Sequence, residues 1–264
     1  MKILKDWLGN IMAGKPRTIL RKVPEITVYF WIIKLLTTAM GEVTSDFLVH
    51  QINPIFAVAL GGIGLAAALV LQLLVRRYAA WIYWLAVVMV AVFGTMVADV
   101  LHVGFGIPYL VTTVFFSVSL AVIFVAWHKV EKTLSIHSIN TPRREIFYWA
   151  TVMATFALGT AAGDMTAITL HLGYFSSGVL FTILFAIPGI AYWRFGLNEV
   201  FAFWFAYIVT RPLGASFADW IGRPHILSGL GVGTGWVSLS LTILIIVFVG
   251  YLTVTRKDIK VEQR

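Results

Sequence analysis

Residues 31–46 read WIIKLLTTAMGEVTSD, and this stretch recurs in altered form three more times along the chain. Each copy holds a tryptophan, a glycine ten residues after it and an aspartate five residues after the glycine. The four sets are Trp31-Gly41-Asp46, Trp84-Gly94-Asp99, Trp149-Gly159-Asp164 and Trp204-Gly214-Asp219. Self-similarity with a fixed internal spacing is the signature of a repeat architecture. The chain is therefore predicted to contain four copies of one structural unit.

The composition indicates that these repeats lie in a membrane. Of the 264 residues, 59% are hydrophobic and 12% are charged, whereas soluble domains contain about 25% charged residues. In lipid only helices and closed barrels satisfy every backbone hydrogen bond, and apolar runs of roughly 20 residues fit helices rather than barrel strands. The predicted fold class is an all-α integral membrane protein with eight transmembrane helices, arranged as four parallel two-helix repeats.

Each repeat is expected to hold one outward helix, a turn and one returning helix. The predicted spans are 24–49 with 54–75, 79–102 with 108–128, 144–170 with 176–194 and 198–220 with 232–254. The predicted domains are a cytoplasmic N-terminal segment, 1–22, an eight-helix membrane domain, 23–253, with repeats 23–77, 78–128, 143–197 and 198–253, and a cytoplasmic tail, 254–264. Because each repeat holds an even number of spans, all four share one orientation. For residues 1–22, a short interfacial helix and plain disorder stay open.

The positive charge is segregated along the chain. All but three of the 20 Lys and Arg residues lie in the chain ends or in alternate connections, and the three exceptions are Lys34, Arg211 and Arg223. This is the positive-inside bias, and it predicts that both termini lie in the cytoplasm, with the protein in a bacterial cytoplasmic (inner) membrane. The net charge of +8 thus orients the protein, and nucleic acid is not expected as a partner. An aromatic belt near the cytoplasmic ends is predicted from Trp81, Trp84, Trp127, Trp149 and Trp193.

The Trp-x9-Gly-x4-Asp pattern, together with Thr-Arg-Pro-Leu-Gly-Ala-Ser-Phe-Ala-Asp-Trp at 210–220, resembles a bacterial family of membrane proteins. Members of that family have four tandem repeats, each with two transmembrane segments and a characteristic tryptophan. The resemblance covers residues 22–253 and implies the fold and the membrane location, with Trp31, Trp84, Trp149 and Trp204 as the family's hallmark positions. It implies no particular activity.

Polar side chains follow one face of each outward helix, because residues four apart share a helix face. The four stripes are Lys34, Thr38, Glu42 and Asp46; Val87, Ala91, Thr95 and Asp99; Val152, Phe156, Thr160 and Asp164; and Tyr207, Arg211, Ala215 and Asp219. A charge that faces lipid costs roughly 2.5–3.5 kcal/mol. The stripes are therefore predicted to face the bundle interior or a water-filled cavity.

The aspartates and glycines of the repeat allow two interpretations. Near the outer boundary an aspartate also caps a turn, and a glycine also permits close helix contact. Four aspartates in one register favour a common acidic vestibule. The predicted cation-binding residues are Glu42, Asp46, Asp99, Asp164, Asp219, Thr95 and Thr160.

Histidines and basic residues extend the candidate site. Carboxylate and imidazole ligands without thiolate suit divalent ions such as Mn or Zn, and the predicted metal ligands are His50, His102, Asp46 and Asp99. A titratable proton relay is the alternative role of the same groups. Lys34 and Arg211 are predicted to gate or to supply counter-charge, or else to form structural ion pairs. Glu42 is the expected partner of Lys34, and a neighbouring aspartate that of Arg211.

The predicted function is a multi-pass transporter for a small cation through a central acidic cavity, with a divalent metal ion or proton coupling as its forms. The alternative is a membrane binding or sensor protein for a lipid or small hydrophobic ligand, in which the aspartates are structural caps. An enzyme is not expected, because no phosphate loop, haem motif or nucleophile elbow is present. No cofactor other than a bound divalent metal ion is predicted. The expected partners are the lipid bilayer and a small cation or proton, and a homo-oligomer stays open.

A proline lies directly after Arg211, and the chain contains no cysteine. Pro212 follows Arg211 and predicts a kink or break in its span, a pattern typical of transport sites. The chain contains no cysteine, which excludes disulfides and thiolate metal sites.

Overall fold

The computed structural model describes residues 21–259, so most of the predicted N-terminal segment and the last residues of the tail lie outside the described residues. The long helices of this range are α2 (Val28–Gln51), α3 (Pro54–Leu74), α4 (Ala80–Asp99), α5 (Tyr109–Glu131), α6 (Pro142–Asp164), α7 (Gly173–Phe195), α8 (Glu199–Gly222) and α9 (Thr234–Thr255). Two π-helical turns, η1 (Val100–Gly104) and η3 (Met165–Thr169), continue α4 and α6. The regular structure within 21–259 is entirely helical, as predicted.

Seven of these helices are long and apolar enough to cross a membrane, which indicates a multi-pass membrane protein. They are α3 to α9, with α4 and α6 counted together with their π turns. The outer helices keep most of their apolar surface exposed, and only 17% of the most apolar window of α9 is buried. Such surfaces indicate contact with lipid. The eighth helix, α2, has a similar length, but its Lys34, Glu42 and Asp46 lower its hydropathy.

Side-chain caps fix several helix starts. The side-chain oxygens of Asn53 and Asn198 accept hydrogen bonds from the backbone N–H groups that follow them, at 2.9 and 3.1 Å. Thr141 caps α6, and Pro142 occupies the first helical position, where its missing N–H costs nothing. The starts of α3, α6 and α8 therefore follow from local sequence.

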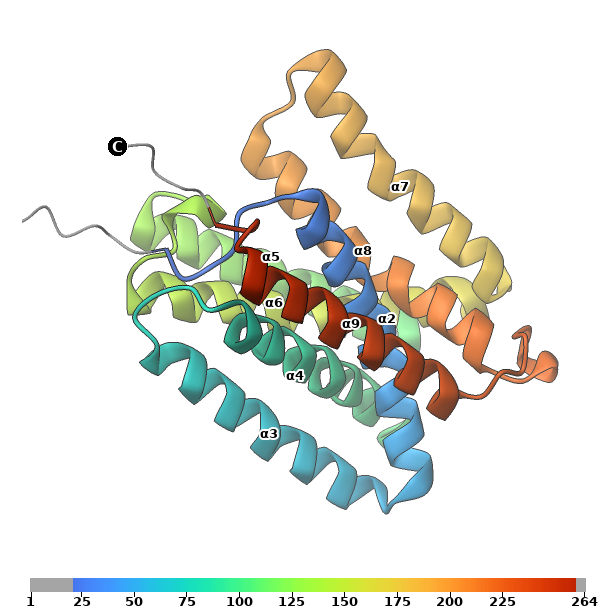
Figure 1. Cartoon of the computed structure of the whole chain (residues 1–264). Coiled ribbons are helices and arrows are strands. Elements are labelled where there is room, and N and C mark those ends of the chain that lie inside the picture. The colour runs from blue at the N-terminus through green and yellow to red at the C-terminus, as the bar shows by residue number, and fades with distance from the viewer. Residues whose placement is uncertain (1–20, 260–264) are drawn as a thin grey trace, which may run out of the picture.

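The first helices of the four repeats form a closed ring, and the second helices cover it (Figure 1). Both α2 and α6 pack against α4 and α8, which makes the ring α2–α4–α6–α8. Outside this ring, α3 lies mainly on α4, α5 on α6, α7 on α8 and α9 on α2. The second helix of each repeat thus covers the first helix of the next repeat, and the last repeat closes on the first.

The repeat glycines lie where neighbouring inner helices touch. The four glycines and the side chains against which a Cβ would collide are Gly41 with Ala91, Gly94 with Phe156, Gly159 with Arg211, and Gly214 with Thr38. A Cβ at Gly41 would lie only 2.5 Å from that of Ala91. Each partner stands seven residues after the tryptophan of the next repeat, and the fourth glycine meets the first repeat. The predicted role of glycine in close helix contact is confirmed.

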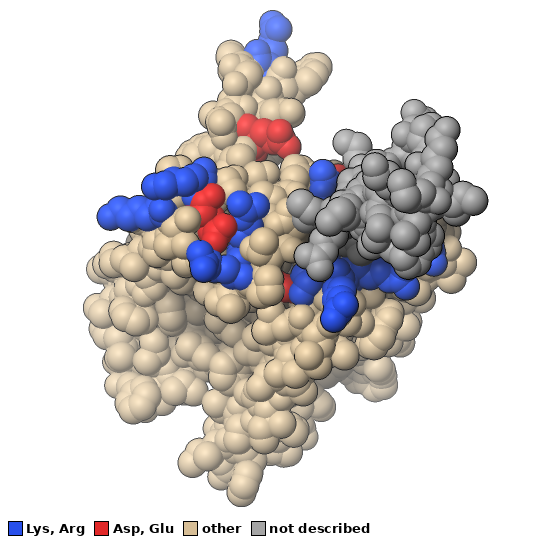
Figure 2. Space-filling view, turned by 90° about the vertical axis from the view of Figure 1, so that its left-hand side faces the viewer, with Lys and Arg blue, Asp and Glu red and all other residues tan. Residues whose placement is uncertain are grey.

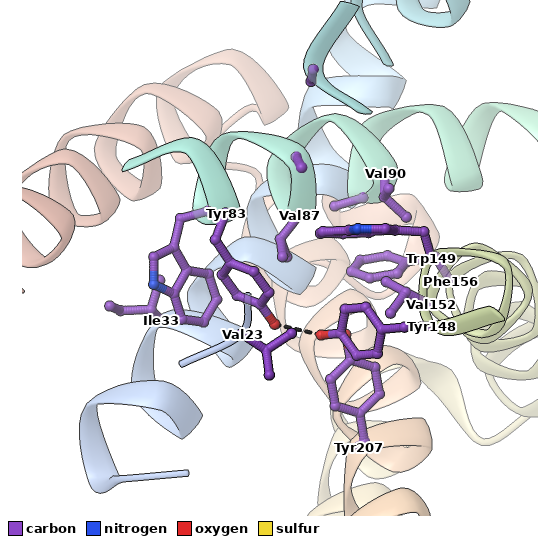
Figure 3. Packing of buried hydrophobic residues seen from close by; sticks show 14 of the residues in the cluster. Val23, Ile33, Tyr83, Val87, Val90, Tyr148, Trp149, Val152, Phe156 and Tyr207 are labelled. Atoms are coloured by element: carbon purple, nitrogen blue, oxygen red, sulfur yellow. Dashed lines mark hydrogen bonds between the residues drawn. The ribbon is translucent and has the colours of Figure 1, made fainter. Parts of the chain in front are cut away.

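Aromatic side chains near the starts of the inner helices form a second ring. It links each repeat to the next in the same order as the glycine contacts. Every repeat tryptophan follows another aromatic residue, which packs on the tryptophan of the next repeat. The pairs and their centroid distances are Phe30–Trp84 at 5.8 Å, Tyr83–Trp149 at 5.7 Å, Tyr148–Trp204 at 6.3 Å and Phe203–Trp31 at 5.9 Å. Figure 3 shows part of this cluster around Tyr83, Tyr148 and Trp149.

The predicted aromatic belt is wrong for three of its five tryptophans. Trp84, Trp127 and Trp149 are at most 5% exposed, because they pack between helices rather than at a lipid boundary. Trp81 and Trp193 are 51% and 85% exposed and lie on the surface. The repeat tryptophans Trp84, Trp149 and Trp204 are therefore core residues, whereas Trp31 is partly buried.

The first and last described residues of the chain lie at the same end of the bundle, and this end is basic. Figure 2 looks onto this end and shows Lys and Arg side chains spread across it, with few acidic ones between them. The exposed basic residues on the chain ends and connections include Arg76, Arg77, Lys129, Lys132, Arg143, Arg194, Arg256 and Lys257. Positive charge that is segregated in the sequence is thus also segregated in the fold.

Hydrogen bonds hold residues near the first and last described residues against this basic end of the bundle. The amine of Lys22 lies 2.5 Å from a carboxylate oxygen of Glu145, and the amide of Gln72 donates to the other oxygen at 3.0 Å. The hydroxyl of Tyr78 donates to Asp258, just after α9. These contacts join the segment before α2 to α3 and α6, and the segment after α9 to the α3–α4 connection.

Candidate functional site

The four polar stripes meet in the centre of the ring. All of their side chains are buried except Asp99, which is half-buried. Residues at equivalent repeat positions form four successive layers: Lys34, Val87, Val152 and Tyr207; Thr38, Ala91, Phe156 and Arg211; Glu42, Thr95, Thr160 and Ala215; and Asp46, Asp99, Asp164 and Asp219. Polar and charged groups therefore continue along the axis of the bundle.

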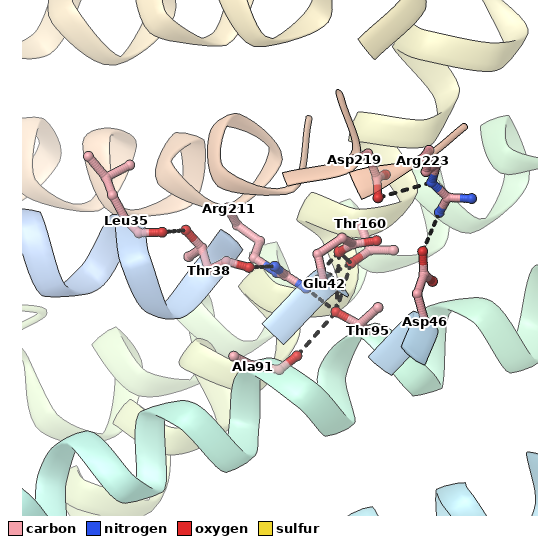
Figure 4. Close-up of polar contacts among 10 residues, drawn as sticks. All are labelled: Leu35, Thr38, Glu42, Asp46, Ala91, Thr95, Thr160, Arg211, Asp219 and Arg223. Atoms are coloured by element: carbon pink, nitrogen blue, oxygen red, sulfur yellow. Dashed lines mark hydrogen bonds and ion pairs between the residues drawn. The ribbon is translucent and has the colours of Figure 1, made fainter. Parts of the chain in front are cut away.

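Arg211 binds groups from all three other inner helices (Figure 4). Its Nη2 atom lies 3.0 Å from Oε2 of Glu42 and donates to the hydroxyls of Thr95 and Thr160. Its Nη1 atom donates to the backbone oxygen of Thr38 at 2.5 Å. Arg211 and Glu42 are at most 1% exposed. Glu42, rather than an aspartate, is therefore the partner of Arg211, and we call these two residues the central ion pair.

The helix around Arg211 differs from the prediction. α8 runs without a break through Pro212 from Glu199 to Gly222. Gly159 of α6 stands directly opposite Arg211 and Pro212, where it leaves room for both side chains. Of the two predicted alternatives, a kink or a break, the break at Pro212 is wrong, because α8 stays helical on both sides of the proline.

Lys34 occupies the adjacent layer, and no described residue forms a hydrogen bond with its amine. Its Nζ atom is buried and lies 4.0 Å from the ring centroids of both Phe156 and Tyr207. Contact with ring faces stabilises an ammonium group, although less than a carboxylate does. Glu42, its expected partner, binds Arg211 instead. Lys34 is thus a buried amine between two aromatic rings.

Tyrosines extend the polar groups beyond Lys34. The hydroxyls of Tyr83 and Tyr148 lie 2.5 Å apart, and Tyr207 lies beside Tyr148 in Figure 3. All three are buried. We call the buried side chains of Tyr83, Tyr148, Tyr207, Lys34, Arg211 and Glu42 together the axial column; hydrogen bonds join Tyr83 to Tyr148 and Arg211 to Glu42.

Arg223 binds two of the four repeat aspartates at the opposite end of the axial column. Its Nη2 atom lies 2.8 Å from Asp46, and its Nε atom lies 3.0 Å from Asp219 (Figure 4). Burial lowers the pKa of Arg223, but Asp219, Asp46, Tyr174 and Asp164 raise it by more, so that its pKa lies above the usual value. Arg223 therefore stays charged.

Asp99 and Asp164 differ from the other two aspartates. Within residues 21–259, no hydrogen bond or ion pair holds either carboxylate. The π turns η1 and η3 begin directly after Asp99 and Asp164, and such turns are frequent at functional sites. The repeats therefore supply two paired and two unpaired carboxyl groups.

The predicted metal ligands do not come together. Among the residues that the structure describes, no group of three or more His, Asp or Glu side chains could hold a metal ion. Nδ1 of His50 lies 2.6 Å from the backbone oxygen of Asp46, and Nδ1 of His102 lies 2.7 Å from that of Ile107. Among the described residues, the structure thus does not group His50, His102, Asp46 and Asp99 into a metal site, and both imidazoles contact local backbone instead.

The sequence prediction missed the roles of Arg223, Tyr83 and Tyr148. Arg223 stands four residues after Asp219, the spacing at which side chains on a helix face meet. An aromatic residue before every repeat tryptophan was also visible in the sequence. Both patterns are present in the sequence, but Arg223, Tyr83 and Tyr148 lie outside the four polar stripes.

Fold and site together define a helical multi-pass membrane protein whose four repeats enclose a buried polar axis. The family described as Repeat of Unknown Function (DUF347) matches the chain four times, at residues 29–78, 82–133, 147–197 and 202–258. These matches cover most of the chain, and the protein belongs to this family. No curated protein and no solved structure gives a match.

Proposed function

We propose that the protein is a transporter of the bacterial cytoplasmic membrane and that the proton is its transported or coupling ion. In this proposal all eight helices cross the membrane, and the basic end with both termini faces the cytoplasm. The observation that carries the proposal is the buried amine of Lys34, which has no hydrogen-bond partner within residues 21–259 and lies next to the central ion pair. Ionisable groups inside a membrane bundle are costly and usually functional.

The packing of the centre favours a proton over a hydrated ion. Lys34, Glu42, Thr95, Thr160 and Arg211 are at most 2% exposed, so side chains fill the axis. A hydrated cation would have to displace them. A proton needs only groups that take it up and release it in turn, and the axial column supplies such groups.

Each ionisable group has a distinct role in this proposal. Asp99 and Asp164 exchange protons, or bind a co-transported small cation, at the outer end. Glu42 receives a proton from them. Once Glu42 is neutral it no longer balances the charge of Arg211, which then attracts the carboxylates nearby. Lys34 passes the proton on, because both protonation states of its amine are tolerated at this position. The ring faces beside it stabilise the charged form, and the neutral form leaves no buried charge.

The variant Lys34→Met tests this role. Methionine keeps the length and the apolar packing of the side chain but cannot carry a proton. We expect at least a tenfold loss of proton flux in proteoliposomes, measured with an entrapped pH-sensitive dye under a potassium diffusion potential. We also expect equal or higher thermal stability, because replacing a buried charge with an apolar side chain is often neutral or stabilising.

Lys129→Met is the matched control, because Lys129 is exposed at the end of α5. It should leave the flux unchanged. A wild-type flux in Lys34→Met would overturn the role of the amine. Wild-type protein that moves neither protons nor Na⁺, K⁺, Mg²⁺ or Mn²⁺ under any gradient would overturn transport. In that event the binding or sensor alternative gains support, and Asp99→Asn should leave ligand binding intact.

A further inference from the structure

A groove lies between α2, α7 and α8, near the basic end of the bundle and separate from the axial column. Its volume is about 500 Å³, within the range of roughly 300–1,000 Å³ that is typical of small-molecule sites. Trp31, Phe185 and Phe203 form its aromatic wall. The centroids of Trp31 and Phe185 lie 5.5 Å apart. The groove therefore offers apolar rings to a molecule of drug size.

Two carboxylates stand at the mouth of this groove. His137 lies between them, with Nδ1 3.9 Å from Glu25 and Nε2 3.5 Å from Glu199. Neither distance is that of a normal hydrogen bond. Arg21 contacts the other oxygen of Glu25. Within residues 21–259, no hydrogen bond therefore holds Oε2 of Glu25 or the carboxylate of Glu199, and His137 is their basic neighbour within 4 Å.

The wall formed by α7 leaves space in the groove. Gly189 lines it, and a Cβ at this position would meet nothing within 4 Å. A larger side chain at residue 189 would therefore enter open space instead of colliding with a neighbour.

We propose that the groove binds a lipophilic organic cation. The charged group lies beside Glu25 and Glu199, where it competes with the imidazole of His137 for their carboxylates. The apolar body lies on Trp31, Phe185 and Phe203, whose ring faces also attract a cation. A phospholipid fits less well, because its phosphate would face the same carboxylates. The site shares no residue with the axial column, so it stands whether or not the protein transports protons.

Tetraphenylphosphonium and tetraphenylborate are matched probes, since they share a shape and differ in the sign of their charge. We expect saturable binding of tetraphenylphosphonium to the full-length protein in nanodiscs, measured by equilibrium dialysis against empty nanodiscs. Tetraphenylborate should bind at least tenfold more weakly. Gly189→Leu, which fills the groove, should weaken tetraphenylphosphonium binding at least tenfold. Gly250→Leu is the control, because Gly250 of α9 also faces open space but lies outside the groove.

A second variant keeps the test decisive if Gly189→Leu fails to fold. Glu25→Gln with Glu199→Gln removes both charges and should also lower the affinity at least tenfold. Equal binding of the two probes, or full affinity in both variants, would overturn the proposal. Saturable displacement of the probe when phosphatidylethanolamine is added to the nanodiscs would identify a lipid as the occupant and would overturn it as well.

Discussion

Replacing Glu42 with leucine lowers the free energy of unfolding by about 3–5 kcal/mol, because it leaves the guanidinium of Arg211 buried without its counter-ion. Both side chains are at most 1% exposed, and Thr95 and Thr160 offer only neutral oxygens in place of the carboxylate. Reversible unfolding in mixed detergent micelles, followed by tryptophan fluorescence, measures this loss.

The double variant Glu42→Leu/Arg211→Leu isolates the cause. It removes both charges, and a buried ion pair replaced by apolar residues is often tolerated. We expect it to recover most of the stability that Glu42→Leu loses. Glu199→Leu is the control for a surface carboxylate, since its side chain is 63% exposed, and should change stability by less than about 1 kcal/mol. A double variant no more stable than Glu42→Leu would contradict the ion-pair explanation.

Gly41→Ala should cost about 1–3 kcal/mol through overpacking. The added Cβ would lie 2.5 Å from the Cβ of Ala91 and 2.8 Å from its backbone carbon. Because backbone atoms cannot rotate aside, α2 and α4 must separate. The thermal midpoint in detergent measures the effect.

Gly250→Ala is the matched control, because a Cβ at Gly250 meets nothing within 4 Å. Alanine has the higher helix propensity, and this variant should gain up to about 1 kcal/mol. If Gly41→Ala were as stable as Gly250→Ala, the repeat glycines would not set the spacing of the inner helices.

Features encoded in short stretches of sequence could be predicted. Hydropathy and the Trp-x9-Gly-x4-Asp spacing gave the four helix pairs, and Thr141-Pro142 marked the start of α6. The contact role of the glycines followed from their place in apolar helices. These inferences need no knowledge of which helices are neighbours.

Features that depend on neighbours could not be predicted. Glu42 and Arg211 are 169 residues apart in the sequence, and only closure of the ring brings them together. Hydropathy gives the depth of a tryptophan but not the face it occupies, so Trp84 and Trp149 looked like surface residues. The metal hypothesis assumed regular helix beyond Asp99, where the structure has a π turn.

Closure of the ring by the last repeat is the claim on which the central ion pair and the axial column depend, and cysteine cross-linking tests it most directly. The chain has no cysteine of its own. The hydroxyls of Thr44 in α2 and Ser238 in α9 lie 2.6 Å apart. In native membranes, oxidation should link the pair Thr44→Cys/Ser238→Cys readily. It should not link Thr44→Cys/Val122→Cys, since Val122 is 61% exposed on α5. An unlinked first pair, or equal linking of both, would contradict the closed ring.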